Sequence, residues 1–148
     1  MERVVIDPVR VEIDARERLL TTTTGGERVG QLIRNALQDN LAPRGKPKEP
    51  LYRLKIEVTE YRQSSIISVT DDATRISIQM VAVYRLEDWR SEETVYSGRS
   101  RAISAYNILP ADYGNIAAER DTRARLASEL AQNIRQALGV FFRRQTAG

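Results

Sequence analysis

The sequence contains no cysteine and no histidine, and only three of its 23 basic residues are lysines. Without these two residue types the chain has no thiol nucleophile, disulfide, thiolate or imidazole metal ligand, or Ser-His-Asp catalytic group. No apolar run approaches the roughly 18 residues that a membrane-spanning helix requires. No signal peptide is recognisable at the start. We therefore expect no enzymatic activity, no metal site and no cofactor.

The remaining composition is that of an ordinary globular protein. With 148 residues, 41% hydrophobic and 29% charged, the chain is expected to form one domain over residues 1–148. The net charge is only +3, but arginine dominates the basic residues. Arginine binds phosphate and carboxylate through two parallel hydrogen bonds, so an anionic partner is one interpretation. The other is a solvated surface combined with the base composition of the genome.

The chain is organised around residues 99–142. Residues 99–106 are predicted to form a strand, and a short link leads to a long amphipathic helix that runs to the end of the chain. Asp112 is a plausible N-cap, because its carboxylate can accept hydrogen bonds from the first turn. The predicted apolar stripe recurs mostly at spacings of three and four and comprises Ile116, Ala124, Ala127, Leu130, Ala131, Ile134, Leu138 and Phe141.

On the polar side of this helix the sequence predicts two ion pairs four residues apart. These are Glu119 with Arg123 and Asp121 with Arg125, each with the acid preceding the base. A helix of this length spans about 45 Å at 1.5 Å per residue, so it is long enough to cover a sheet face and extend beyond it.

The N-terminal third predicts a strand over residues 4–13, with Pro8 at an edge, at a bulge or at the strand's beginning. A polar loop over residues 15–26 and a helix over residues 27–41 follow. The next segment, residues 46–50, is a linker.

The middle of the chain predicts a hairpin. Residues 51–60 alternate strictly between apolar and polar side chains, and residues 63–70 extend the hairpin towards a return strand over residues 74–87. Residues 88–93 form a polar turn with Trp89 as a partly buried anchor, and the last strand begins at Thr94. The expected element order is β-α-β-β-β-α, with the first two strands parallel. The predicted fold is α+β, a two-layer sandwich in which two helices cover one face of a mixed four-stranded sheet.

Six basic residues are candidate ligand-binding residues, because alternation puts them on or near the sheet face opposite the helices. That cationic face is predicted to attract phosphate-bearing lipid, nucleic acid or an acidic protein surface. The alternative is a solvated face neutralised by Glu57 and Glu87. The six residues are Arg53, Lys55, Arg75, Arg85, Arg99 and Arg101.

The tip of the predicted hairpin is unusually apolar. Hairpin tips are normally polar, yet Ile66, Ile67 and Val69 lie together between serines and two aspartates. One interpretation is insertion into a partner protein or into lipid acyl chains. The other is that the hairpin curls and buries these side chains under the end of the sheet.

Several short segments, in this order and spacing, resemble the LPS-assembly lipoprotein family LptE. The resemblance covers residues 28–142, and most of its motifs are structural. They are RVGQLIRNAL at 28–37, LAPRG at 41–45, YRL at 52–54, ATR at 73–75, AVYRL at 82–86, SAYN at 104–107 leading to Tyr113, AERD at 118–121, LA at 130–131 and IR at 134–135.

The resemblance implies a non-enzymatic component of lipopolysaccharide export at the periplasmic side of the outer membrane. It implies that the chain plugs and helps assemble the β-barrel translocon LptD and that it contacts lipopolysaccharide. Family members are anchored by a lipid on a cysteine that follows a signal peptide, and we expect that cysteine to lie outside this sequence. The alternative is another periplasmic lipoprotein, such as an auxiliary subunit of a lipid transporter. A third alternative is a nucleic-acid-binding α+β domain that uses the cationic face. It is disfavoured, and no nucleic-acid partner is expected, because that face has few aromatic residues on which bases would stack.

Overall fold

The computed structural model describes residues 4–6, 10–13, 25–41, 50–66, 74–108 and 115–147. The elements follow the predicted order β-α-β-β-β-α, except that the first strand is in two pieces. They are β1 (Val4–Ile6), β2 (Arg10–Ile13), α1 (Gly25–Leu41), β3 (Tyr52–Ile66), β4 (Thr74–Asp88), β5 (Thr94–Ile108) and α2 (Asn115–Ala147).

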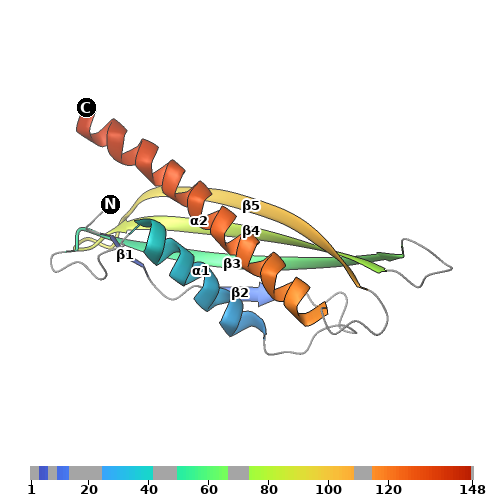
Figure 1. Ribbon diagram of the computed structural model, residues 1–148. Helices are drawn as coiled ribbons and strands as arrows, with labels where there is room; N and C mark the ends of the chain where they lie inside the picture. Colours follow the sequence, from blue (N-terminus) through green and yellow to red (C-terminus); the bar gives the residue numbers. More distant parts are fainter. Residues whose placement is uncertain are drawn as a thin grey trace.

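The strands form one mixed sheet in the order β1-β3-β4-β5, and β2 pairs with the same side of β3 as a continuation of β1. Both N-terminal strands run parallel to β3, whereas β3 with β4 and β4 with β5 are antiparallel. Helices α1 and α2 cover the same face of this sheet, and α2 crosses it diagonally so that its end extends past β5 (Figure 1). The predicted two-layer α+β fold is confirmed.

The hairpin of β3 and β4 confirms the predicted alternation and the described part of the predicted extension beyond Glu60. β3 continues past Glu60 to Ile66, and all 15 of its residues pair with β4. Every predicted inner residue of β4 is buried, because alternate side chains of a strand point to the same face. This inner set is Ile76, Ile78, Met80, Ala82, Tyr84 and Leu86.

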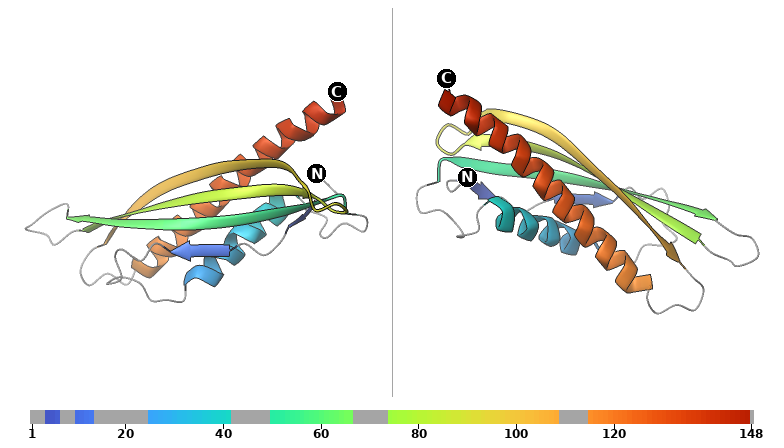
Figure 2. Two further views of the ribbon diagram at one scale, coloured as in Figure 1. Left: turned by 180° about the vertical axis from the view of Figure 1, so that it is seen from behind. Right: turned by 45° about the horizontal axis from the view of Figure 1, so that its top comes forward.

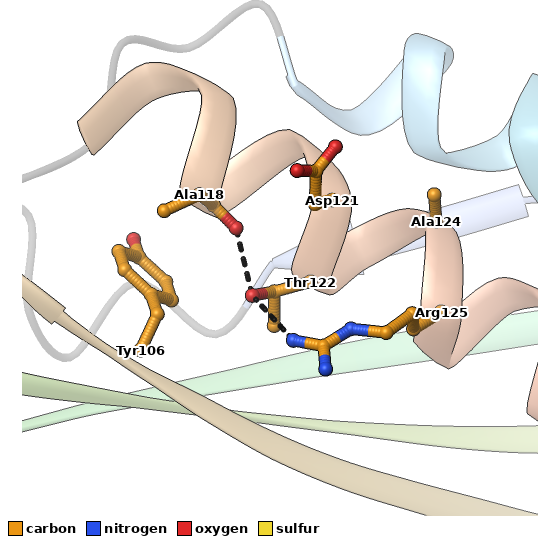
Figure 3. Close-up of a pocket in the computed structure, with 6 residues that line it drawn as sticks. All are labelled: Tyr106, Ala118, Asp121, Thr122, Ala124 and Arg125. Carbon is orange, nitrogen blue, oxygen red and sulfur yellow. Dashed lines mark hydrogen bonds between the residues drawn. The ribbon is translucent and has the colours of Figure 1, made fainter. Parts of the chain in front are cut away.

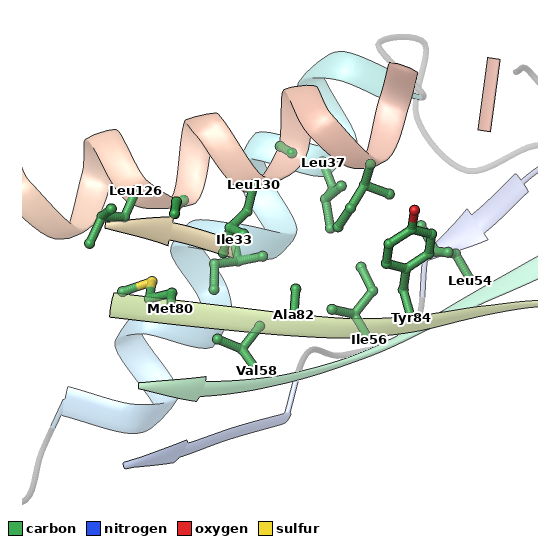
Figure 4. Close-up of a cluster of buried hydrophobic side chains, with 14 of the residues drawn as sticks. Ile33, Leu37, Leu54, Ile56, Val58, Met80, Ala82, Tyr84, Leu126 and Leu130 are labelled. Carbon is green, nitrogen blue, oxygen red and sulfur yellow. The ribbon is translucent and has the colours of Figure 1, made fainter. Parts of the chain in front are cut away.

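The core lies between this inner face and the two helices. Ile33 and Leu37 of α1 and Leu126 and Leu130 of α2 are fully buried against the sheet (Figure 4). α1 begins at Gly25, so the prediction that residues 25 and 26 belong to a loop was wrong. Glycine is a weak helix former, but it does not prevent the first turn from forming.

The apolar stripe predicted on α2 needs one correction. Ala124 is exposed, whereas Thr122 and Leu126 on either side of it are fully buried. Two residues correspond to 200° of helix rotation, so Ala124 faces away from the sheet when these two face it. The hydroxyl of Thr122 donates a hydrogen bond to the carbonyl oxygen of Ala118 at 2.7 Å, which satisfies the buried oxygen.

The predicted polar turn at residues 88–93 is confirmed, and Asp88 organises it. Its Oδ1 accepts hydrogen bonds from the backbone N–H groups of Arg90 at 2.9 Å and Ser91 at 3.0 Å. These hydrogen bonds stabilise the charged form and lower the pKa of Asp88. Glu92 closes the turn with a φ of 60°, and Trp89 is partly buried as expected.

The predictions for Pro8, for Asp112 and for most of the 15–26 loop and the 46–50 linker fall outside the described residues. Among the helices that are described, none has an apolar stretch long enough to cross a membrane.

Candidate functional site on the uncovered sheet face

The face of the sheet opposite the helices carries no described element over it, and we call it the open face (Figure 2, left). The side chains of β3 and β4 that pack against the helices are even-numbered. The odd-numbered residues and their partners in β5 therefore project onto the open face. All six predicted basic residues are in this set. Their role in binding a ligand remains a prediction.

Three of the six lie together and are exposed, and we call Arg85, Arg99 and Arg101 the arginine cluster. Arg99 and Arg101 are consecutive open-face residues of β5, paired with Val83 and Val81 of β4. Arg85 is the next open-face residue after Val83, so it is a diagonal neighbour of Arg99 at about 7–8 Å between Cα atoms. Within the described residues, none of the three takes part in an ion pair.

The other three basic residues do not join this cluster. Lys55 lies opposite Arg85 in the register, but its Nζ is 3.4 Å from Oε1 of Glu87. The guanidinium of Arg53 stacks over the ring of Trp89 at 4.6 Å from the ring centroid. Arg75 is ten residues from Arg85 along β4, which corresponds to about 33 Å. Glu87, one of the two acids that the sequence analysis expected to neutralise this face, therefore neutralises Lys55.

An apolar strip lies beside the arginine cluster, and the sequence reasoning missed it. It consists of Tyr61, Val81, Val83 and Ile103, of which Val83 is 50% and Ile103 is 65% exposed. Ile103 pairs with Gln79, and Gln79 pairs with Tyr61, so the strip crosses all three long strands. The alternation that assigned arginines to this face also assigns these four residues to it.

The open face is therefore amphiphilic. It presents guanidinium groups, which pair bidentately with phosphate or carboxylate, directly beside exposed branched and aromatic side chains. Exposed apolar residues that gather on one surface mark sites of interaction more often than single scattered ones do. This arrangement suits a ligand that carries anionic groups next to a hydrocarbon portion.

The covered face holds a four-residue ion network, of which the sequence predicted one pair. Arg123 Nε donates to Glu60 Oε1 at 3.0 Å, and Arg123 Nη1 is 2.8 Å from Glu119 Oε1. Arg62 also pairs with Glu119. The predicted Glu119–Arg123 pair thus exists, but it lies between α2 and β3 and not on the polar side of the helix. The network joins the helix to the sheet.

Next to this network an open cavity of about 570 Å³ lies between the end of β5 and one side of α2 (Figure 3). Its lining is formed by Tyr106, Ala118, Asp121, Thr122, Ala124 and Arg125. Burial is the main cause that raises the pKa of Tyr106, and the nearby carboxylate of Glu119 raises it further. The phenol is therefore protonated at neutral pH and able to donate a hydrogen bond.

The predicted partner-contact tip begins at the end of β3. Ile66 is the last residue of β3 and pairs with Thr74. Ile67 and Val69 lie outside the described residues, so the insertion of this tip into a partner stays a prediction. Across the described residues, no three acidic side chains come together in a way that would hold a metal ion.

Comparison with known proteins identifies a family. A sequence-family model described as LptE, Lipopolysaccharide-assembly, matches residues 9–138 of the chain. A search of curated proteins gives no match.

Solved structures share the fold. A protein described as a lipoprotein from Caulobacter crescentus CB15 is similar over 93% of this chain and 92% of its own, with a TM-score of 0.64 and 23% identity. A minor lipoprotein from Acinetobacter baumannii is similar over 94% of each chain, with a TM-score of 0.55 and 14% identity. At these identities the likeness concerns the fold.

Proposed function

Because this chain belongs to the LptE lipopolysaccharide-assembly family, we propose that it binds lipopolysaccharide on its open face as a partner of the barrel LptD. Family membership supports a role in lipopolysaccharide assembly at the outer membrane. The more specific proposal is supported by the chemistry of the open face. The observation that carries it is the exposed arginine cluster directly beside exposed Val83 and Ile103.

Lipopolysaccharide has the two chemical features that this surface suits. Its phosphate groups would accept hydrogen bonds from the guanidinium groups of Arg85, Arg99 and Arg101, which have no described acidic partner to displace. Its acyl chains would cover Val83 and Ile103, and each square ångström of apolar surface removed from water contributes about 25 cal/mol. Neither feature alone explains why the two kinds of side chain are adjacent.

A binding role without catalysis is part of the proposal. It is supported by a sequence that has no histidine or cysteine. Core residues of both helices pack on the helix-covered face, whereas no described element lies over the open face, which we propose for the ligand. We further propose that the chain works on the periplasmic side of the outer membrane, where it plugs and helps assemble LptD. The tip at Ile66, Ile67 and Val69 is the segment we propose to contact the barrel wall.

Two measurements on the purified chain test this proposal. The first is the dissociation constant for lipopolysaccharide at low and high salt, with a neutral detergent as the control ligand. Binding that weakens with salt for lipopolysaccharide but not for the detergent is the expected result, because exposed charges are screened. The second is co-purification with LptD after co-expression. Salt-independent lipopolysaccharide binding contradicts the role of the arginines, and absence of a complex contradicts the role of LptD.

A further inference from the structure

The long edge strand of the sheet is available for pairing. β5 is last in the strand order and pairs with β4 alone among the described strands. It is 15 residues long and contains no proline, so nothing in its sequence removes a backbone N–H from its outer side. An edge strand of this kind presents a row of N–H and C=O groups to which another chain can add.

A cavity lies at one end of this edge strand. The cavity of about 570 Å³ lies where β5 ends, between Tyr106 and the side of α2 formed by Ala118, Thr122 and Arg125 (Figure 3). A strand and a helix that flank a hollow are the arrangement used when an extended peptide adds to a sheet. Main-chain hydrogen bonds then supply affinity, and a pocket selects the side chain at one position.

The side chains of β5 indicate what kind of strand fits. Arg101 and Ile103 are exposed consecutive residues on the open face of the edge strand. A second copy of the chain is disfavoured as the added strand, because antiparallel self-pairing around Arg101 brings like charges directly opposite each other. An added strand with an acidic residue facing Arg101 and an apolar residue facing Ile103 is complementary. It also leaves Arg85 and Arg99 for an anionic ligand.

We propose that an extended segment of the barrel partner adds as a further strand to the free edge of β5 and inserts one side chain into the cavity beside Tyr106. This inference rests on the proposed function, because the segment is assigned to the same partner. It concerns the edge of the sheet and the helix-side cavity, whereas lipopolysaccharide is proposed to bind the open face. The partner strand would thus border the lipid site at Arg101 and Ile103 and leave Arg85, Arg99 and Val83 to the lipid alone.

Residue-resolved amide hydrogen exchange on the purified chain, alone and in complex with LptD, tests the strand addition. In the free chain, the outward-directed amides of β5 exchange fast because they have no strand partner. In the complex we expect alternate amides of residues 94–108 to slow by at least about tenfold, since alternate residues of an edge strand point outward. A complex with unchanged β5 exchange overturns the strand addition and leaves the partner proposal standing. Failure to form any complex overturns both.

A pair of variants tests the cavity. Ala118→Phe fills the cavity, whereas Ala117→Phe adds the same ring at the neighbouring exposed position that does not line it. We expect the first to weaken the complex by at least about tenfold and the second by less than about twofold, because the inserted side chain loses its space. Urea unfolding of both variants checks that each is folded. Equal affinities of the two folded variants overturn the role of the cavity.

Discussion

Arg123 of α2 donates its Nε to Oε1 of Glu60 on β3 at 3.0 Å, and the Glu60 side chain is completely buried. This ion pair joins the helix layer to the sheet layer. A buried charge that loses its partner is strongly destabilising, whereas replacing both members by apolar residues is close to neutral.

The first prediction follows from this pair. Arg123→Met should lower the free energy of unfolding by about 3–5 kcal/mol, because it leaves the Glu60 carboxylate buried without its cation. The double variant Glu60→Leu with Arg123→Met should recover most of that loss. Urea denaturation measures both. Arg125→Met, an exposed position on the same helix, is the control and should change little. If the single and double variants are equally stable, the pair does not hold the layers together.

The second prediction concerns the core. Leu130→Ala should cost about 2–5 kcal/mol, the usual range for removing a buried leucine side chain, because Leu130 is fully buried. Val140→Ala on the same helix should cost less, since Val140 is 42% exposed. Thermal or urea unfolding of the two variants gives the comparison. A Leu130 variant no less stable than the Val140 variant would contradict the packing of α2 on the sheet.

A third prediction concerns the close approach of Gly98 to Tyr84. A Cβ at Gly98 would lie 2.6 Å from Cζ of the Tyr84 ring, which no real contact allows. Without such a contact, alanine in a strand is more stable than glycine by about 0.5–1 kcal/mol. The contact with the Tyr84 ring therefore decides whether Gly98→Ala stabilises or destabilises the protein. Gly98→Ala should destabilise by about 1–3 kcal/mol, the usual cost of overpacking.

Its control is a double-mutant cycle. In a Tyr84→Leu background, where the ring is gone, Gly98→Ala should cost close to nothing. A cost that is the same in both backgrounds would mean that the ring does not sit over Gly98.

The fourth prediction is a loss of stability in alkali. Burial raises the pKa values of Tyr84 and Tyr106 above 10.0, their ordinary value. The unfolded chain therefore loses these protons first, so the stabilisation is complete below about pH 10 and falls as the pH rises above it. Urea midpoints between pH 9 and 11 measure the slope. Tyr84→Phe and Tyr106→Phe should each make it shallower. A slope that neither variant changes would contradict the burial of both phenols.

The strands were the part of the fold that the sequence predicted best. In β3 and β4 one face packs against the core and the other is exposed to solvent. The alternation at Leu54, Ile56 and Ile78 therefore predicts both the pairing register of the strands and the face that is buried. The helix was harder, because alanine occurs on both sides of α2. Ala124 and Ala127 look alike in a periodic pattern, but the first is exposed and the second is buried.

The candidate site was predicted in part. Alternation is sufficient to assign arginines to the open face, but the separation of Arg75 from Arg85 depends on the strand length of the folded hairpin. The stacking of Arg53 on Trp89 and the pairing of Glu60 with Arg123 join residues 36 and 63 positions apart. No local pattern encodes such contacts. The apolar strip at Val83 and Ile103 is encoded by the same alternation as the arginines.

The measurement that tests the central claim most directly is lipopolysaccharide binding by two charge-reversal variants. Arg85→Glu with Arg99→Glu alters the open face, whereas Arg120→Glu with Arg135→Glu alters two exposed positions of α2 by the same total charge. We predict that the first variant binds lipopolysaccharide at least about tenfold more weakly than wild type, equivalent to about 1.4 kcal/mol, and that the second changes much less. Equal weakening by both variants, or none by the first, would contradict a lipopolysaccharide site on the open face.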